Sequence, residues 1–450
     1  MKVQVLQTAT PVLLAQMLNL LYNIVDRIYI SRIPGEGTAA LGGVGICFPI
    51  ILLISAFTWL FGNGGAPLFA IERGRRQDKE ASELMALSFS LLAGTGIVIL
   101  AAGEIFCEPL LSLFGASEAA MPYSLPYLRI YLLGTVFSMI ATGMNPYLNA
   151  QGFPLMGMLS VTIGAAGNIA LDTIFITILH FGVEGAAIAT VVSQAASAAI
   201  VFLFLTGKKV TIRLHRTGFR EMVNMRKKIG EIAGLGAAGF VMQVTNGVVQ
   251  LAYNSILVHA GGDLYISAMA VLTSLRQVLE TPMHAIAEGA SPIISFNYGA
   301  KNVERIRTSA RFMFGLEMGY SVFIWLLLMV FPHWFLTLFS TDRGLLQVAV
   351  PALRKYLGAF FFMVFMITGQ TVFKSLNCRK IAIFFSLLRK VIIILPLTWI
   401  LSYGLHLGTD GVFLSEPISN IAGGMACFLT MCVLIRKKLR REFGTDGRKL

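Results

Sequence analysis

Long apolar stretches separated by short polar connections run along the whole chain. Each stretch is long enough for an α-helix to cross the roughly 30 Å hydrocarbon core of a bilayer. The stretches are continuously apolar rather than alternating, which favours helices over the strands of a membrane barrel. We therefore predict twelve membrane-spanning helices, at residues 9–31, 41–62, 82–103, 125–148, 157–180, 185–206, 230–259, 265–289, 309–331, 350–373, 382–405 and 411–435.

The connections between these stretches differ in charge. If the N-terminus lies inside, the inner connections hold the basic residues of 73–79, 208–228, 301–311, 379–380 and the tail from 436, whereas the outer ones hold only Arg32 and Arg343. Because Lys and Arg of short loops stay in the cytoplasm, we expect a multi-pass protein of the cell inner (plasma) membrane with both termini cytoplasmic.

Composition supports a membrane protein. Of 450 residues, 56% are hydrophobic and 13% are charged, against about 25% charged in soluble domains. The formal net charge of +13 would suggest a nucleic-acid partner in a polar chain, but here the topology explains it. We expect membrane lipids and small molecules as partners, and no nucleic acid.

The chain contains an internal repeat. Gln16, Asn19 and Val44 recur at the same spacing as Gln243, Asn246 and Val271. Two halves that each hold six spans enter the membrane with the same sense, as in parallel transporter repeats. We predict an N-terminal six-helix lobe at 1–206, a cytoplasmic basic interlobe linker at 207–229, a C-terminal six-helix lobe at 230–436 and a cytoplasmic tail at 437–450.

The first predicted helix carries a polar stripe. Gln16, Asn19, Asn23 and Asp26 follow spacings of three and four residues, which places them on one face. Such a face avoids lipid. The seventh helix repeats the pattern, with a tyrosine in place of the aspartate; its members are Gln243, Asn246, Gln250 and Tyr253.

A second carboxylate lies inside the fifth span. Asp172 follows Asn168 by one turn, on the same face. Ionisable groups inside a span are expensive and usually functional, and oxygen ligands suit a small hard cation. Asp26 and Asp172 therefore predict a proton or sodium site. The alternative is a pair of carboxylates hydrogen-bonded for helix packing.

Arg276 and Glu280 stand one turn apart in the eighth span. They form either a neutralised structural ion pair or a substrate-facing carboxylate with its partner. Together with the polar stripe of the seventh helix, they are our candidate substrate cavity. Pro11 is expected to bend the first helix, because proline removes an internal hydrogen bond.

Several motifs occur in the order of a known family. They are Gln16 to Asp26, ending in Leu-Tyr-Asn-Ile-Val-Asp, then Pro34-Gly35, Gly62-Asn63-Gly64-Gly65-Ala66-Pro67, Leu171-Asp172, Gly185 to Thr190, and Ser291-Pro292 through Ala300. The chain thereby resembles the multidrug and toxic compound extrusion (MATE) family over nearly its whole length, and most closely its prokaryotic DinF or MepA-like branch.

The resemblance implies an all-α membrane protein of two pseudo-symmetric six-helix lobes. In this branch the cation site lies in the first lobe, and the matching positions are Asp26, Asn145, Asn168, Asp172 and Thr190, with Tyr22 and Asn19 nearby and Pro11 as the bending proline. Relatives of the NorM type carry a carboxylate on the seventh helix where this chain has Gln243, which argues against a second cation site.

The resemblance also implies a function. We expect a cation-coupled antiporter that exports amphipathic, often cationic drugs and toxic compounds, acting as a monomer without a cofactor, with H+ or Na+ as the coupling ion. The chain has no Walker-type loop for ATP, and no clustered nucleophile or metal site that would indicate an enzyme. A flippase of lipid-linked precursors or polysaccharide is the rival, with cationic candidates at Arg129, Arg276, Lys355, Lys374, Arg389 and Lys390.

Overall fold

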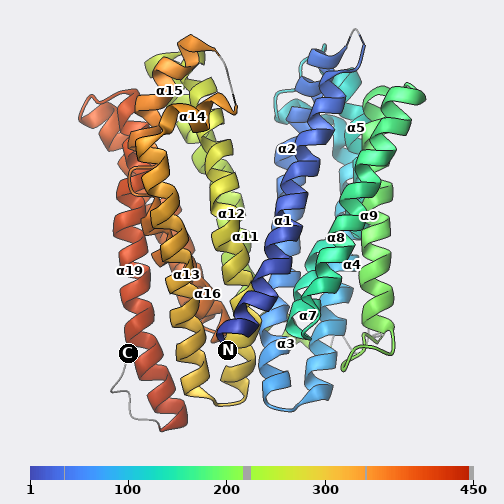
Figure 1. The fold of residues 1–450 in the computed structure, drawn as a ribbon. Helices are drawn as coiled ribbons and strands as arrows, with labels where there is room; N and C mark the ends of the chain where they lie inside the picture. Colours follow the sequence, from blue (N-terminus) through green and yellow to red (C-terminus); the bar gives the residue numbers. More distant parts are fainter. Residues whose placement is uncertain (35, 216–223, 340–341, 445–450) are drawn as a thin grey trace. The chain divides into compact units, whose positions relative to one another are not determined.

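The computed structural model describes residues 1–34, 36–215, 224–339 and 342–444, and every regular element within them is helical (Figure 1). Gly35, the middle of the predicted linker (216–223) and the end of the predicted tail (445–450) lie outside the described residues. The all-α membrane fold predicted from the sequence is confirmed.

The chain divides into two compact units. The first unit comprises Thr10–Gln243, and the second comprises Met1–Ala9 with Val244–Leu450. Both divisions fall inside long helices, so that the first turns of one helix and the later turns of another belong to the second unit. The lobe boundaries expected from the sequence stay a prediction.

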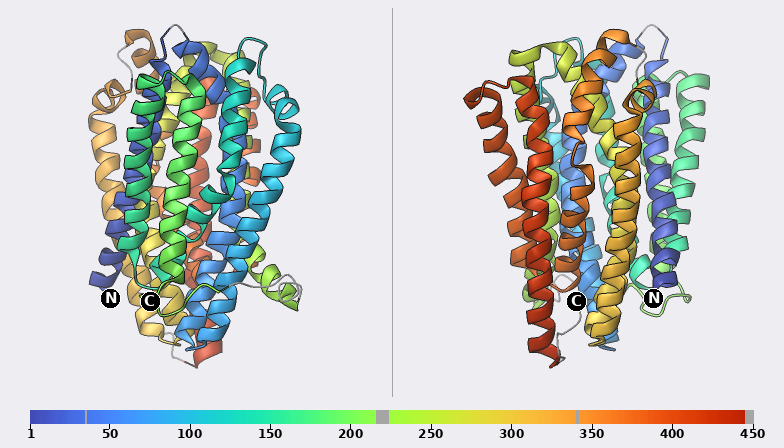
Figure 2. Two further views of the ribbon diagram at one scale, coloured as in Figure 1. Left: turned by 90° about the vertical axis from the view of Figure 1, so that its right-hand side faces the viewer. Right: turned by 60° about the vertical axis from the view of Figure 1, so that its left-hand side comes forward.

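The first unit begins within α1 and ends within α11. Its helices are α1 (Lys2–Ser31), α2 (Gly37–Thr58), η1 (Trp59–Asn63), α3 (Gly64–Gly74), α4 (Asp78–Leu113), α5 (Met121–Leu133), α6 (Thr135–Gly143), α7 (Asn145–Ala150), α8 (Pro154–Asp172), η2 (Thr173–Ile178) and α9 (Gly182–Thr206). The helices α8 and α9 run side by side (Figure 2), and this contact positions the buried polar groups described below.

The second unit holds the later half of α11 (Arg226–Gly261) and the helices after it. These are α12 (Asp263–Gly299), α13 (Val303–Val330), α14 (Pro332–Thr337), α15 (Arg343–Tyr356), η3 (Phe360–Phe362), α16 (Met363–Ser375), α17 (Arg379–Leu387), η4 (Leu388–Ile394), α18 (Leu395–Trp399), η5 (Ile400–Gly404) and α19 (Thr409–Phe443). Helix α19 packs against α15 and α16 and against η4.

Most of these helices are long enough to cross a membrane. Among the described residues, nine helices are long and apolar enough to span a bilayer, and the bent pairs α5 with α6–α7 and α15 with η3–α16 raise the number to eleven. The remaining predicted span, 265–289, lies within the 37-residue α12. Its Arg276, Glu280 and His284 lower the hydropathy there, although its length is ample.

The glycine-rich motif after the second span allows helices to approach closely. A Cβ at Gly62 would lie 2.5 Å from the backbone of Gly143, and one at Gly64 would lie 2.3 Å from the carbonyl oxygen of Ile232. At Gly65 a Cβ would lie 2.1 Å from the hydroxyl of Tyr147. Small residues that let backbones meet are a common device of membrane helix packing, so this motif joins η1 and α3 to α6, α7 and α11.

Helix α1 is continuous from Lys2 to Ser31 and contains Pro11 in its interior. Two π-helical segments stand next to polar clusters: η2 directly follows Asp172, and η4 contains Arg389 and Lys390. Wider helical turns of this kind often occur at functional sites.

Candidate functional site

Helix α1 meets the end of α8 beside both predicted carboxylates. The hydroxyl groups of Tyr29 and Thr173 lie 2.8 Å apart. Tyr29 follows Asp26 by three residues on the same face of α1, and Thr173 is the residue directly after Asp172. Asp26 and Asp172 are also within electrostatic range of each other. The fold thus places the two aspartates in one neighbourhood.

Helices α8 and α9 contribute the buried side chains of Asn168, Asp172 and Thr190 to this neighbourhood. Asp172 is fully buried and Asn168 is 2% exposed. The Nδ2 atom of Asn168 donates to Oγ1 of Thr190 at 3.4 Å. We call Asp26, Asn168, Asp172 and Thr190 the carboxylate site.

Most oxygen atoms of the carboxylate site lack a protein donor. Among the described residues, Oδ1 of Asp26, Oδ1 of Asn168 and both side-chain oxygens of Asp172 are buried without a hydrogen-bond partner. Leaving one buried acceptor unsatisfied costs about 1–3 kcal/mol. Four such atoms in one neighbourhood are the arrangement expected of a group that receives a proton or a cation.

Asn145 is the first residue of α7 and contacts the beginning of α8. Its Nδ2 atom is 3.2 Å from the carbonyl oxygen of Gly157 and 3.4 Å from Oγ of Ser160, in the first turns of α8. Asn168 is eight residues further along this helix, or about 12 Å at 1.5 Å per residue. The structure therefore brings together four of the five residues expected at the cation site, and places Asn145 at the opposite end of α8.

The other members of the α1 stripe are half-buried or exposed. Nδ2 of Asn23 donates to the backbone oxygen of Asn19 at 2.6 Å and lies 3.3 Å from its Oδ1. Gln16 and Tyr22 are half-buried on the same helix. This N-terminal part of the stripe thus satisfies part of its hydrogen bonding within α1.

Two tyrosines that the sequence analysis did not single out lie near Asp26. Tyr127 and Tyr131 of α5 are buried, their rings stack with centroids 6.2 Å apart, and both are within electrostatic range of Asp26. Their spacing of one helical turn inside the fourth predicted span was the available signal. Within the part of the chain that the structure describes, no group of three or more His, Cys, Asp or Glu side chains is arranged to hold a metal ion.

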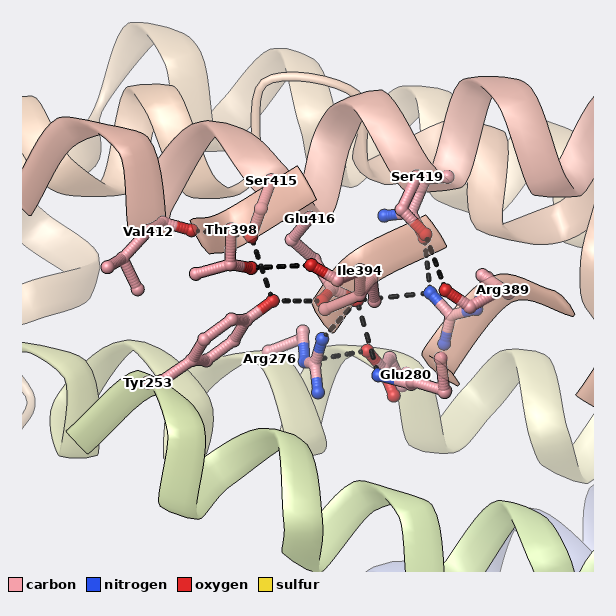
Figure 3. Close-up of polar contacts among 12 residues, drawn as sticks. Tyr253, Arg276, Glu280, Arg389, Ile394, Thr398, Val412, Ser415, Glu416 and Ser419 are labelled. Carbon is pink, nitrogen blue, oxygen red and sulfur yellow. Dashed lines mark hydrogen bonds and ion pairs between the residues drawn. The ribbon is translucent and has the colours of Figure 1, made fainter. Parts of the chain in front are cut away.

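The second unit contains a different polar site, centred on Glu416 of α19. Its Oε1 atom lies 2.7 Å from Nη1 of Arg276, 3.0 Å from Nη1 of Arg389 and 3.6 Å from Nζ of Lys390. Nε of Arg276 is 3.0 Å from Oε1 of Glu280. We call these five residues the charge cluster, and Figure 3 shows four of them converging from α12, η4 and α19.

Tyr253 completes the charge cluster. Its hydroxyl lies 3.1 Å from Oε2 of Glu416 and 3.0 Å from Oγ of Ser415 (Figure 3). The guanidinium carbon of Arg276 lies over the ring of Tyr356, 5.4 Å from its centre, as in a cation–π contact. Of the candidate substrate cavity, the structure thus joins Tyr253, Arg276 and Glu280.

The other cavity candidates do not belong to the charge cluster. Nε2 of Gln250 donates to Oδ1 of Asn254 at 3.1 Å, along α11 itself. Gln243 and Asn246 are half-buried on the same helix, and they fall on either side of the division between the units.

Glu416 is the central residue of the charge cluster, and the sequence analysis did not single it out. A carboxylate in the twelfth predicted span was itself the signal, because ionisable groups at membrane depth need a partner. Glu317 in the ninth span carried the same signal; it is fully buried and accepts a 2.6 Å hydrogen bond from Thr368.

Comparison with known proteins agrees with this architecture. The sequence matches the profile of the MatE family over residues 11–174 and 221–400. An FAD transporter of Shewanella oneidensis is 26% identical over 94% of this chain and 92% of its own length. The multidrug export protein MepA of Staphylococcus haemolyticus is 24% identical over 75% of this chain and 74% of its own length.

A solved outward-facing multidrug resistance transporter of the MATE family has the same fold, with a TM-score of 0.89 and 23% identity over 98% of this chain and 97% of its own. The matched profile covers most of the chain. The protein therefore belongs to the MATE family of multi-pass membrane transporters.

Proposed function

We propose that this protein is a cation-coupled antiporter in which the carboxylate site binds the coupling ion, H+ or Na+. The observation that carries the proposal is the set of four buried oxygen atoms of Asp26, Asn168 and Asp172 without a protein donor. A proton or a sodium ion would supply the missing partner. No cofactor and no catalytic step is needed.

Coupling follows from like charge. Two buried carboxylates in one neighbourhood repel each other when both are ionised, so a cation from outside binds favourably and changes the forces on α1. An ion gradient supplies the energy, with about 2.3 kcal/mol per charge per 100 mV from the membrane potential.

Helix α1 is the element that would transmit the change. Tyr29 ties it to Thr173 beside Asp172, and Pro11 lies four turns before Asp26. A helix that lacks one internal hydrogen bond bends at lower cost. We propose that occupancy of the carboxylate site changes the bend at Pro11 and thereby the affinity for the exported compound.

The exported compounds are proposed to be amphipathic and often cationic. The likeness to MepA, which is named a multidrug export protein, supports this class. We further propose a functional monomer in the inner membrane with both termini cytoplasmic, supported by the basic inner connections. A C-terminal reporter fusion that is active only in the cytoplasm tests the orientation.

Efflux from proteoliposomes tests the coupling. Ethidium transport is measured under an imposed proton gradient and then under a sodium gradient, for the wild type, Asp26→Asn and Asp172→Asn. We expect the wild type to respond to one of the two gradients, and each variant to lose at least nine-tenths of that response, because an amide neither takes up a proton nor offers a charged ligand.

Asp78→Asn is the matched control. Asp78 lies in the first turn of α4 and is exposed, so the same chemical change there should leave efflux unaltered. Gradient-driven ethidium transport that survives both site substitutions would overturn the proposal.

The flippase of lipid-linked precursors or polysaccharide is the alternative function. Of its cationic candidates, Lys355 is neutralised by Asp410 at 2.5 Å. Accumulation of a lipid-linked sugar in a deletion strain with unchanged drug resistance would favour the flippase instead.

A further inference from the structure

We infer that the charge cluster of the second unit is a binding site for an oxyanion, the carboxylate or phosphate group of a transported compound, with Lys390 as its main cation. The inference rests on the proposed export function only in taking the ligand to be cargo. Anion binding itself can be measured without transport.

The first step is the charge balance. The cluster brings together three cationic side chains, Arg276, Arg389 and Lys390. Among the described residues, the carboxylates of Glu280 and Glu416 oppose them, so the cluster contains one more basic side chain than carboxylates. A buried cation without a counterion is unfavourable, so an oxyanion is favoured at this place.

The second step is the geometry of Lys390. Its side chain is 4% exposed, and its approach to Glu416 is 3.6 Å, which is longer than the 2.7–2.9 Å typical of a charge-assisted hydrogen bond. The two arginines hold the same Glu416 oxygen at 2.7 and 3.0 Å. The ammonium of Lys390 is therefore the least satisfied donor of the cluster.

The third step is access. The side chains of Arg276 and Glu280 are each 16% exposed, whereas that of Glu416 is 1% exposed. The guanidinium carbon of Arg276 also lies over the ring of Tyr356. Its planar guanidinium suits carboxylate and phosphate oxygens, so Arg276 would meet an incoming oxyanion first and Lys390 would hold it.

The fourth step is the rigidity of the surroundings. Glu416 is contacted by Tyr253 at Oε2 and by the three basic side chains at Oε1, and Arg389 also donates to Asn420. The π-helical turn η4 carries Arg389 and Lys390 side by side into this site. A site whose donors are already held in place loses little entropy when a ligand binds.

Binding of three matched coumarins to the detergent-solubilised full chain tests the inference by calorimetry. The probes are 7-methoxy-4-methylcoumarin, which is neutral, 7-methoxycoumarin-4-acetate and 4-methylumbelliferyl phosphate. We expect at least one anionic probe to bind tenfold or more tightly than the neutral one, and the stronger of the two identifies carboxylate or phosphate.

Lys390→Gln should weaken the anionic probe at least tenfold and leave the neutral probe unchanged, whereas Lys390→Arg should stay within threefold of the wild type. Lys380→Gln, at an exposed position, removes an equal charge and should change nothing. Equal binding of neutral and anionic probes, or anion binding that Lys390→Gln leaves intact, would overturn the inference.

These results separate the two proposals. If the wild type binds neutral and anionic coumarins equally but still exports ethidium along the ion gradient, only the oxyanion site is refuted. Intact oxyanion binding with efflux insensitive to Asp26→Asn and Asp172→Asn would refute only the coupling site.

Discussion

The two units of this transporter bury charge in opposite ways. In the first unit, Asp26 and Asp172 lie near each other, and three of their four side-chain oxygens are buried without a hydrogen-bond partner in the described structure. Arg27, the next residue of α1, is within electrostatic range of Asp26 but forms no ion pair with it among the described contacts. In the second unit, Glu416 is contacted by three basic side chains and a tyrosine hydroxyl. The first site has unpaired carboxylate oxygens, and the second has more basic side chains than carboxylates.

This difference teaches that the internal repeat conserved positions but not chemistry. The polar stripes of α1 and α11 share a spacing, yet α1 ends in Asp26 and α11 in Tyr253, which donates to a carboxylate instead of providing one. A site with unpaired carboxylate oxygens can bind and release a proton or a metal cation. A site rich in basic side chains can bind an anion or can hold helices together through ion pairs.

The largest effect is expected from Glu416→Gln. It leaves Arg276, Arg389 and Lys390 opposed only by Glu280, and breaking a buried ion pair by removing one partner typically costs about 3–5 kcal/mol. Thermal unfolding of the purified protein should show a strongly lowered midpoint.

The double variant Glu416→Gln with Lys390→Gln should recover part of that loss, because it restores the original excess of one charge. Glu304→Gln, on the exposed first turn of α13, serves as the control. A Glu416→Gln midpoint equal to the control would break the comparison.

Asp172→Asn should have the opposite sign. Because no cation among the described residues pairs with Asp172, its neutralisation should leave the unfolding midpoint unchanged or raise it. The sharper measurement is stabilisation by the coupling ion. If sodium couples, sodium at 100 times its Kd should stabilise the wild type by about 2.7 kcal/mol and the variant not at all.

If protons couple, sodium should stabilise neither protein. Strong destabilisation by Asp172→Asn would show that the aspartate is structurally paired, and the contrast with Glu416 would disappear.

Tyr29→Phe should have a smaller effect. It removes the 2.8 Å contact between Tyr29 and Thr173, and one such hydrogen bond contributes about 1 kcal/mol. We expect a modestly lower midpoint and a weakened response of efflux to the ion gradient, since α1 is less firmly held beside Asp172.

Tyr403→Phe is the matched control, because Tyr403 is 44% exposed in the second unit. If efflux by Tyr29→Phe responds to the ion gradient as in the wild type, the hydrogen bond between Tyr29 and Thr173 is not needed for the movement of α1.

The smallest effect is expected from Lys228→Gln. Lys228 pairs with Glu80 and Glu83 at 2.5 Å each, but the side chains of Lys228 and Glu80 are 25% and 46% exposed. Solvent-exposed pairs contribute about 0–1 kcal/mol and weaken in salt. The unfolding midpoint of Lys228→Gln should therefore lie slightly below that of the wild type at low salt and equal it at high salt. The midpoint of Glu416→Gln should stay lowered at both salt concentrations.

Hydropathy was sufficient to predict the helical spans because the bilayer imposes the same demand on every one of them. Only α12 departs, and the reason is visible in its sequence: Arg276 and Glu280 interrupt the apolar run. The motif Gly62–Pro67 was recognised as a family mark, but its role in close helix packing depends on Gly143 and Ile232, which are distant in sequence.

For the carboxylate site, helical spacing correctly placed Asn168 and Asp172 on one face, and the family resemblance added Thr190, which contacts Asn168. Asn145 shows the limit of that transfer. A residue can match a family motif in sequence and still lie far from the other residues of the site. Asn145 hydrogen-bonds to Gly157 near the beginning of α8, whereas Asn168 and Asp172 lie near its end.

The sequence by itself determined that this protein lies in a membrane, where its helices run, that its two halves repeat, and on which helix faces polar residues lie. These features depend on local hydrophobicity and on the helical period. Only the tertiary structure decided which charges are compensated. Glu416 meets Arg276 and Arg389 across three helices, whereas Asp172 forms no ion pair with any residue that the structure describes. Such pairing depends on distances between segments far apart in the chain, which spacing along one helix does not encode.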